Sequence, residues 1–217
     1  MKTILNKYQI IFLEEFKKHP TLKNMFYLTG GTALAEFYLR HRLSEDIDLF
    51  TYENFDLKAV DLFINRCKDI IKPKDLYRQK IYDRYNYNFV LKDTILKIEF
   101  VKYEFKNLKP LIKRNNLFVN DVYDIAVNKF FTLFDRNEIK DFVDLFFLLK
   151  KFTLNQLIRG VKIKFGFNID PIMIGGELLK IKKNAFMPKM LTPLTREELT
   201  DFFEKQALKL REKIFDF

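Results

Sequence analysis

Two aspartates, Asp46 and Asp48, are the residues of this sequence best suited to hold a metal ion. They alternate with Ile47, Leu49 and Phe50 in a short run that is typical of a strand. Side chains two residues apart on a strand point to the same face, so the two carboxylates would converge. Paired carboxylates suit Mg²⁺, which prefers oxygen ligands and usually keeps substrate phosphates in its shell. The pair therefore predicts chemistry on a phosphate.

A glycine turn precedes the aspartates. Residues 29–32, Thr-Gly-Gly-Thr, join an apolar run to a helical pattern. Glycines let a backbone approach a ligand closely, and a helix beginning there points free N–H groups at an anion. Gly30, Gly31 and Thr32 are therefore candidates to bind the phosphates of a nucleoside triphosphate, and Arg42 could add a charged contact to a triphosphate or to RNA. A plain glycine turn beside a surface acidic pair is the alternative.

A third carboxylate is predicted on a second strand. Between residues 95 and 101, apolar side chains alternate with polar ones, which puts Glu99 on the polar face. There Glu99 could complete a metal site with Asp46 and Asp48, or take the proton from an attacking hydroxyl. A solvated glutamate paired with Lys97 is the competing interpretation.

Further charged candidates fall in helical patterns. Lys129 lies within an apolar stripe, where a lysine either extends outward to solvent or reaches a ligand. Arg136, Lys140 and Asp144 are spaced by four residues, so we expect them on one helix face, where a structural salt bridge would also explain them. Asp141 is rotated away from that face.

The elements that must position these residues change along the chain. The first part mixes the two kinds of element, with helices expected at 3–18, 32–40 and 56–71 and strands at 46–51 and within 76–102. The second part is helical, with helices at 120–135, 138–150, 153–164 and 195–214 and another opened by Asp170 and Pro171. We therefore expect an α+β fold, with a mixed core at 1–116 and a helical lobe at 117–217.

Composition excludes several other classes of protein. The single cysteine, Cys67, excludes an intramolecular disulfide and a multi-cysteine zinc site in this chain of 217 residues. No window approaches 18 apolar residues, and the start lacks a secretion signal pattern, so we expect a cytoplasmic protein without a membrane span. The net charge of +10 fits a polyanionic partner, although a lysine-rich composition explains it equally well.

Together these motifs resemble the AbiEii/AbiGii nucleotidyltransferase toxin family, which includes the MenT toxins and has a polymerase-β-like core. The similarity begins in 28–50 and continues in 121–145 and 190–203. The resemblance implies phosphate binding by Gly30, Gly31 and Thr32, metal binding by Asp46 and Asp48, a nucleotide-site lysine at Lys129 and an active-site acid at Asp141. Glu99 stands where some relatives carry an aspartate.

The resemblance also implies a function. We expect transfer of a nucleoside monophosphate from a triphosphate to a hydroxyl, with Mg²⁺ or Mn²⁺ as cofactor and the tRNA 3′ end as acceptor. The protein would then be the toxin of a toxin–antitoxin or phage-defence system, with an antitoxin as partner. The alternatives are a protein or small-molecule hydroxyl as acceptor, or a nucleotide-binding module without catalysis.

Overall fold

The computed structural model describes residues 3–183 and 186–215, which form two compact units. We call Met1–Asp121 the sheet unit and Val122–Phe217 the helical unit. The sequence places the division five residues earlier, at 116, which lies in the turn of a short hairpin (residues 112–119) that pairs with the sheet.

The sheet unit contains a seven-stranded mixed sheet in the order β3-β4-β5-β2-β1-β7-β6. Its strands are β1 (Tyr27–Thr29), β2 (Ile47–Thr51), β3 (Asp75–Ile81), β4 (Arg84–Val90), β5 (Ile95–Lys102), β6 (Ile112–Arg114) and β7 (Leu117–Val119). The β2–β5 and β1–β7 pairs are parallel and the others antiparallel. The expected α+β fold is confirmed.

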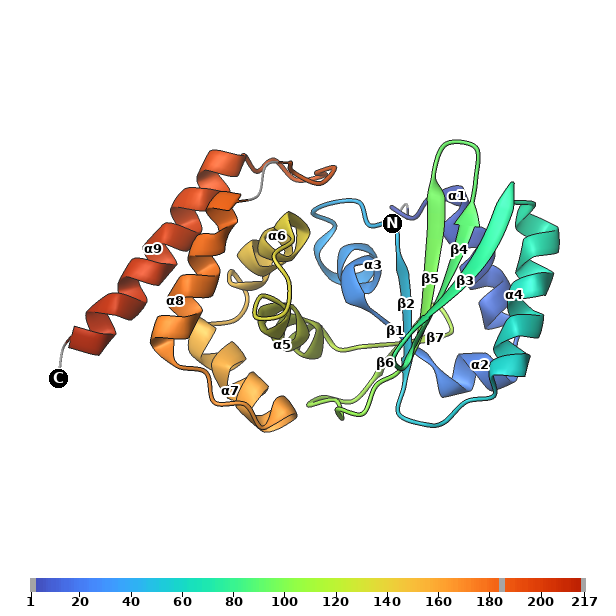
Figure 1. Cartoon of the computed structure of the whole chain (residues 1–217), viewed down its shortest axis with the longest axis horizontal. Coiled ribbons are helices and arrows are strands. Elements are labelled where there is room, and N and C mark those ends of the chain that lie inside the picture. The colour runs from blue at the N-terminus through green and yellow to red at the C-terminus, as the bar shows by residue number, and fades with distance from the viewer. Residues whose placement is uncertain (1–2, 184–185, 216–217) are drawn as a thin grey trace. The chain divides into compact units, whose positions relative to one another are not determined.

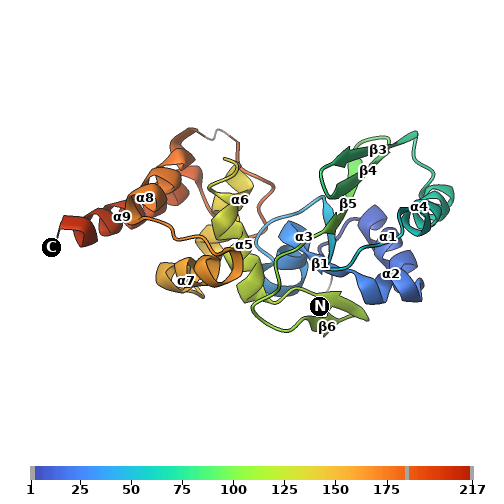
Figure 2. The same ribbon diagram turned by 60° about the horizontal axis from the view of Figure 1, so that its bottom comes forward.

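One face of this sheet is covered by three helices, α1 (Lys7–Lys17), α2 (Pro20–Met25) and α4 (Leu57–Ile71), as Figures 1 and 2 show. Phe12 of α1 and Phe63 of α4 meet edge to face, with ring centroids 5.5 Å apart. Alternation along β2 and β5 buries Ile47, Leu49, Leu96, Ile98 and Phe100. The intervening acidic residues consequently point to the opposite face.

The helical unit contains α5 (Val122–Thr132), α6 (Ile139–Leu148), α7 (Leu154–Phe165), α8 (Pro171–Leu179), the 3₁₀ turn η2 (Lys180–Lys183) and α9 (Arg196–Phe215). Two predicted helix starts are confirmed. Asp170 accepts a hydrogen bond from the Ile172 N–H, and Thr195 and Glu198 form a capping box. None of the helices among the described residues is long and apolar enough to cross a membrane.

Candidate active site

The glycine turn lies directly against the second aspartate. Strand β1 ends at Thr29, which pairs with Asp48 of β2, and the short helix α3 (Gly30–Leu34) begins at once. Gly30 has a φ of +71°, and a Cβ added there would lie only 1.8 Å from Asp48 Oδ2. Both the left-handed backbone and the missing side chain are therefore needed for the Asp48 carboxylate to reach the turn.

The other predicted phosphate-loop residues hold the chain around this turn. The Thr32 hydroxyl donates a hydrogen bond to the Asp46 carbonyl. A Cβ added at Gly31 would lie 2.8 Å from Arg42 Nη2, and Arg42 Nη1 donates to the Leu43 carbonyl at 2.8 Å. These contacts fix the segment that leads into β2, so they position the aspartates.

The three predicted carboxylates are brought to one face of the sheet by strand pairing, and we call them the carboxylate face (Asp46, Asp48 and Glu99). Strands β2 and β5 run parallel with Asp48 beside Glu99. Asp46 lies just before β2 and, like Asp48, interacts electrostatically with Lys97, which is two residues before Glu99 on β5. Glu99 is only 7% exposed. Sequence reasoning identified all three residues but could not supply this register.

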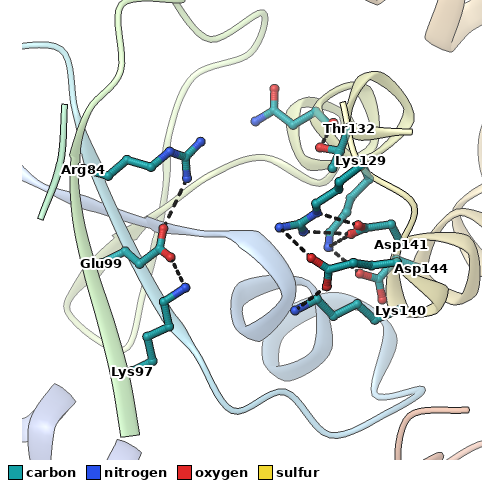
Figure 3. A network of polar contacts seen from close by, with 11 residues as sticks. Arg84, Lys97, Glu99, Lys129, Thr132, Lys140, Asp141 and Asp144 are labelled. Atoms are coloured by element: carbon teal, nitrogen blue, oxygen red, sulfur yellow. Dashed lines mark hydrogen bonds and ion pairs between the residues drawn. The ribbon is translucent and has the colours of Figure 1, made fainter. Parts of the chain in front are cut away.

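Glu99 is also ion-paired: the pairing with Lys97 expected by the competing interpretation is present, but the glutamate is buried and not solvated. Arg84 Nη1 lies 3.2 Å from Glu99 Oε2, and Lys97 Nζ contacts Glu99 Oε1, as Figure 3 shows. Burial alone would lower the pKa of Lys97, but its hydrogen bond to Glu99 and the charges of Glu99, Asp46 and Asp48 raise it above the ordinary value.

The carboxylate face offers oxygen atoms to a cation. Asn86 of β4 lies directly opposite Glu99 and is 5% exposed, and its Oδ1 is buried with no hydrogen-bond partner in the described part of the chain. Carboxylate and amide oxygens are ligands that suit Mg²⁺. Across residues 3–183 and 186–215, however, no group of three or more His, Cys, Asp or Glu side chains is arranged to bind a metal ion. The donor types thus fit a divalent cation, and Glu99 as third ligand stays a prediction.

A second charged cluster lies inside the helical unit, and we call it the helix network (Lys129, Arg136, Asp141 and Asp144). Lys129 Nζ is 2.8 Å from Asp141 Oδ1 and 2.7 Å from Asp144 Oδ2 (Figure 3). Arg136 Nε lies 2.9 Å from Asp141 Oδ2. Burial would raise the pKa of Asp141, but the charges of Lys129 and Arg136 and their hydrogen bonds hold it below the ordinary value.

The expectation that Arg136, Lys140 and Asp144 share a helix face is wrong. Helix α6 begins at Ile139, so Arg136 lies outside it and turns back onto Asp141. Asp144 instead pairs with Lys129 of α5. The reason is burial: Asp141 and Asp144 lie three residues apart on one face of α6, and both carboxylates need a cation inside the unit.

The sequence patterns did not point to several polar and charged residues that contribute to this architecture. Lys164 of α7 and Asp124 of α5 form a fully enclosed ion pair with a 2.8 Å contact. Burial lowers the pKa of Lys164, although Asp124 opposes that shift. Arg84 and Asn86 were also missed. Lys164 is 40 residues from its partner Asp124, and Arg84 is 15 residues from its partner Glu99. Helical or strand periodicity gives no information about contacts at such separations.

Comparison with known proteins agrees with this architecture. A family model described as nucleotidyl transferase AbiEii toxin of a type IV toxin–antitoxin system matches residues 11–216. The protein aq_aa25 of Aquifex aeolicus (strain VF5) is 36% identical over 153 residues, which are 68% of this chain and 69% of that protein.

Two solved structures share the fold. JHP933 from Helicobacter pylori superposes with a TM-score of 0.58 at 22% identity, covering 96% of this chain and 90% of that one. The nucleotidyltransferase toxin MenT4 (Rv2826c) from Mycobacterium tuberculosis H37Rv gives 0.59 at 14% identity, covering 94% and 82%. The family match over nearly the whole chain carries the assignment: this chain belongs to the AbiEii nucleotidyltransferase toxin family of type IV toxin–antitoxin systems.

Proposed function

We propose that this nucleotidyltransferase uses Mg²⁺ or Mn²⁺ to transfer a nucleoside monophosphate from a triphosphate to a hydroxyl of RNA, with the tRNA 3′ end as acceptor. The observation that carries the proposal is the approach of the Asp48 carboxylate to Gly30, within 1.8 Å of where a Cβ would be. A metal-binding carboxylate and a backbone without a side chain thus meet at one point. Phosphates bound at that point would lie beside the cation.

In this proposal Asp46 and Asp48 hold the cation, and Glu99 is its third ligand or the base. A bound divalent cation would neutralise phosphate charge and stabilise the attacking and leaving oxygens. The acceptor oxygen attacks the α-phosphorus, the bond to the β-phosphate oxygen breaks, and pyrophosphate leaves. If Glu99 is the base, its carboxylate takes the proton of the attacking hydroxyl.

The phosphate-binding roles divide in two. Gly30 and Gly31 would offer backbone N–H groups to the triphosphate. Thr32 and Arg42 would keep the turn in shape, because their polar atoms contact the segment before β2.

We assign Lys129 and Asp141 to nucleotide binding on family resemblance. In the helical unit Lys129 is already held by two carboxylates, so Asp141 would orient this lysine. A role in nucleotide binding predicts that a Lys129 variant weakens triphosphate affinity, which calorimetry would measure.

The net charge of the chain is compatible with RNA as the acceptor. The chain carries 39 Lys and Arg against 29 Asp and Glu, and a positive protein attracts a polyanion over long range. We therefore place its action in the cytoplasm, where tRNA is abundant, with an antitoxin that restrains it. A protein or small-molecule hydroxyl remains the second candidate acceptor.

The test is label transfer. The protein is incubated with Mg²⁺, each α-labelled nucleoside triphosphate in turn and total RNA, beside an Asp46→Ala/Asp48→Ala variant and an Asp69→Ala control on the exposed side of α4. We expect a labelled band of tRNA size with the wild type and the control and none with the double variant. Label on protein would replace RNA with the second acceptor class. Triphosphate binding without any transfer would contradict catalysis.

A further inference from the structure

The environment of Lys97 bears on how the carboxylate face takes up a cation. Ile47 of β2 pairs with Ile98 of β5, so continuing the parallel register by one residue brings Asp46 next to Lys97. Lys97 and Glu99 are two residues apart on β5 and share a face. One ammonium group therefore projects to the side of the sheet that carries the three carboxylates.

The Lys97 ammonium offsets the mutual repulsion of these carboxylates. It contacts Glu99 Oε1 directly and interacts electrostatically with both Asp46 and Asp48. Three like charges on one face repel one another, so a positive charge near them is stabilising. Lys97 therefore neutralises part of the negative charge that a bound cation would neutralise.

We propose that Lys97 is the resident counter-ion of the carboxylate face and that a divalent cation binds there in exchange for its ammonium, which leaves Glu99. The proposal rests on the metal-dependent function proposed above and deepens it. A divalent cation brings two charges where the lysine supplied one, and the displaced ammonium becomes able to contact a phosphate.

The exchange is feasible because the ion pairs of Glu99 are exposed on their cationic side. The Lys97 side chain is 35% exposed and that of Arg84 is 49% exposed, so both can turn into water. Hydration compensates a cation that turns into water, and the incoming divalent cation replaces its charge at Glu99, so the enclosed carboxylate is not left unpaired. The Glu99 side chain, by contrast, is only 9% exposed and belongs to an inner strand of the sheet.

The test is a titration of full-length protein with Mn²⁺, following free Mn²⁺ by electron paramagnetic resonance. Lys97→Met removes the charge and keeps the length of the side chain. Lys102→Met removes one charge from the same strand on the opposite face, and is the matched control. We expect Lys97→Met to bind Mn²⁺ about three- to tenfold more tightly than the wild type, and Lys102→Met to bind like the wild type. Melting curves establish that each variant is folded.

A Glu99→Gln background separates exchange from a general field effect. With Glu99 replaced, Lys97→Met should tighten Mn²⁺ binding less, because the ammonium has no carboxylate to leave at that position and only its field on Asp46 and Asp48 remains. An equally large gain in this background would overturn the exchange, as would equal gains from Lys97→Met and Lys102→Met. If Mn²⁺ binds to the wild type and to Lys97→Met with equal affinity, only the proposed exchange is overturned. Absence of Mn²⁺ binding from every variant would overturn the metal-dependent function as well.

Discussion

The carboxylate face and the helix network contain the same kinds of charged group but differ in burial. Beside the carboxylate face, the cations Lys97 and Arg84 keep 35% and 49% of their side chains exposed, while their partner Glu99 keeps 9%. In the helix network, Lys129 keeps 9%, and Asp141 and Asp144 keep none.

This difference separates cations that can turn into water from cations that are enclosed with their partners. An exposed cation recovers hydration when it leaves its partner, so a ligand of the same sign can replace it. Removing one partner from a buried pair costs about 3–5 kcal/mol, because the other charge is left without compensation. The carboxylate face is accordingly suited to accept a cation, and the helix network is suited to hold α5 and α6 together.

The comparison predicts, first, that an aspartate of the carboxylate face matters to rate and not to stability. Asp48→Asn should lower label transfer roughly a thousandfold or more, at least about 4 kcal/mol of barrier, because a metal ligand is lost. Its melting temperature should equal or exceed that of the wild type, because repulsion is relieved. Initial rates and thermal melting measure the two effects, with Asp69→Asn as control. Near-normal turnover of Asp48→Asn would contradict the assignment.

In the helix network, by contrast, we expect a substitution to lower stability. Lys129→Met leaves the buried Asp141 and Asp144 without their shared cation, and should lower the free energy of unfolding by about 3 kcal/mol. The matched variant Lys97→Met should change it by less than about 1 kcal/mol. Urea unfolding of both variants measures the contrast. Equal losses would remove the distinction between the two clusters.

Substitution of the two glycines with positive φ, Gly30 and Gly166, distinguishes the effect of backbone strain from the effect of a changed site geometry. Gly30→Ala and Gly166→Ala should each lose about 1–2 kcal/mol of stability, because alanine disfavours the left-handed region. A Cβ at Gly166 meets nothing within 4 Å, whereas one at Gly30 overlaps Asp48. Only Gly30→Ala should therefore also lose transfer activity, by about tenfold or more if the carboxylate must shift. Unfolding free energies and rates of the two variants decide this; comparable activity in both would mean that the turn tolerates the shift.

The smallest expected effect is the contribution of Asp141 to the loss of stability at low pH. The pKa of Asp141 lies below its ordinary value of 3.8 in the folded protein, so this group favours folding above pH 3.8. Its contribution is lost as the pH falls through the lowered pKa, with a slope of at most about 1.4 kcal/mol per pH unit. Unfolding free energies at pH 5, 4 and 3 should fall less steeply for Asp141→Asn. The same slope in both proteins would show that other carboxylates govern acid unfolding.

Local features of this fold could be predicted from the sequence. The alternation in 95–101 and the capping box of α9 each depend on residues a few positions apart. Helix α2 and the β6–β7 hairpin could not be predicted, because six-residue and three-residue elements contain too few residues to establish a period.

The sequence by itself determined short-range relations: Asp48 on β2 with Asp46 just before it, Glu99 on the polar face of β5, and glycine at the start of α3. Periodicity of the backbone dictates such short-range relations. Only the tertiary structure decided that Asp48 lies beside Glu99, and that Lys129 lies between Asp141 and Asp144. Those contacts depend on strand register and helix packing between distant segments, which are set by burial of the whole core.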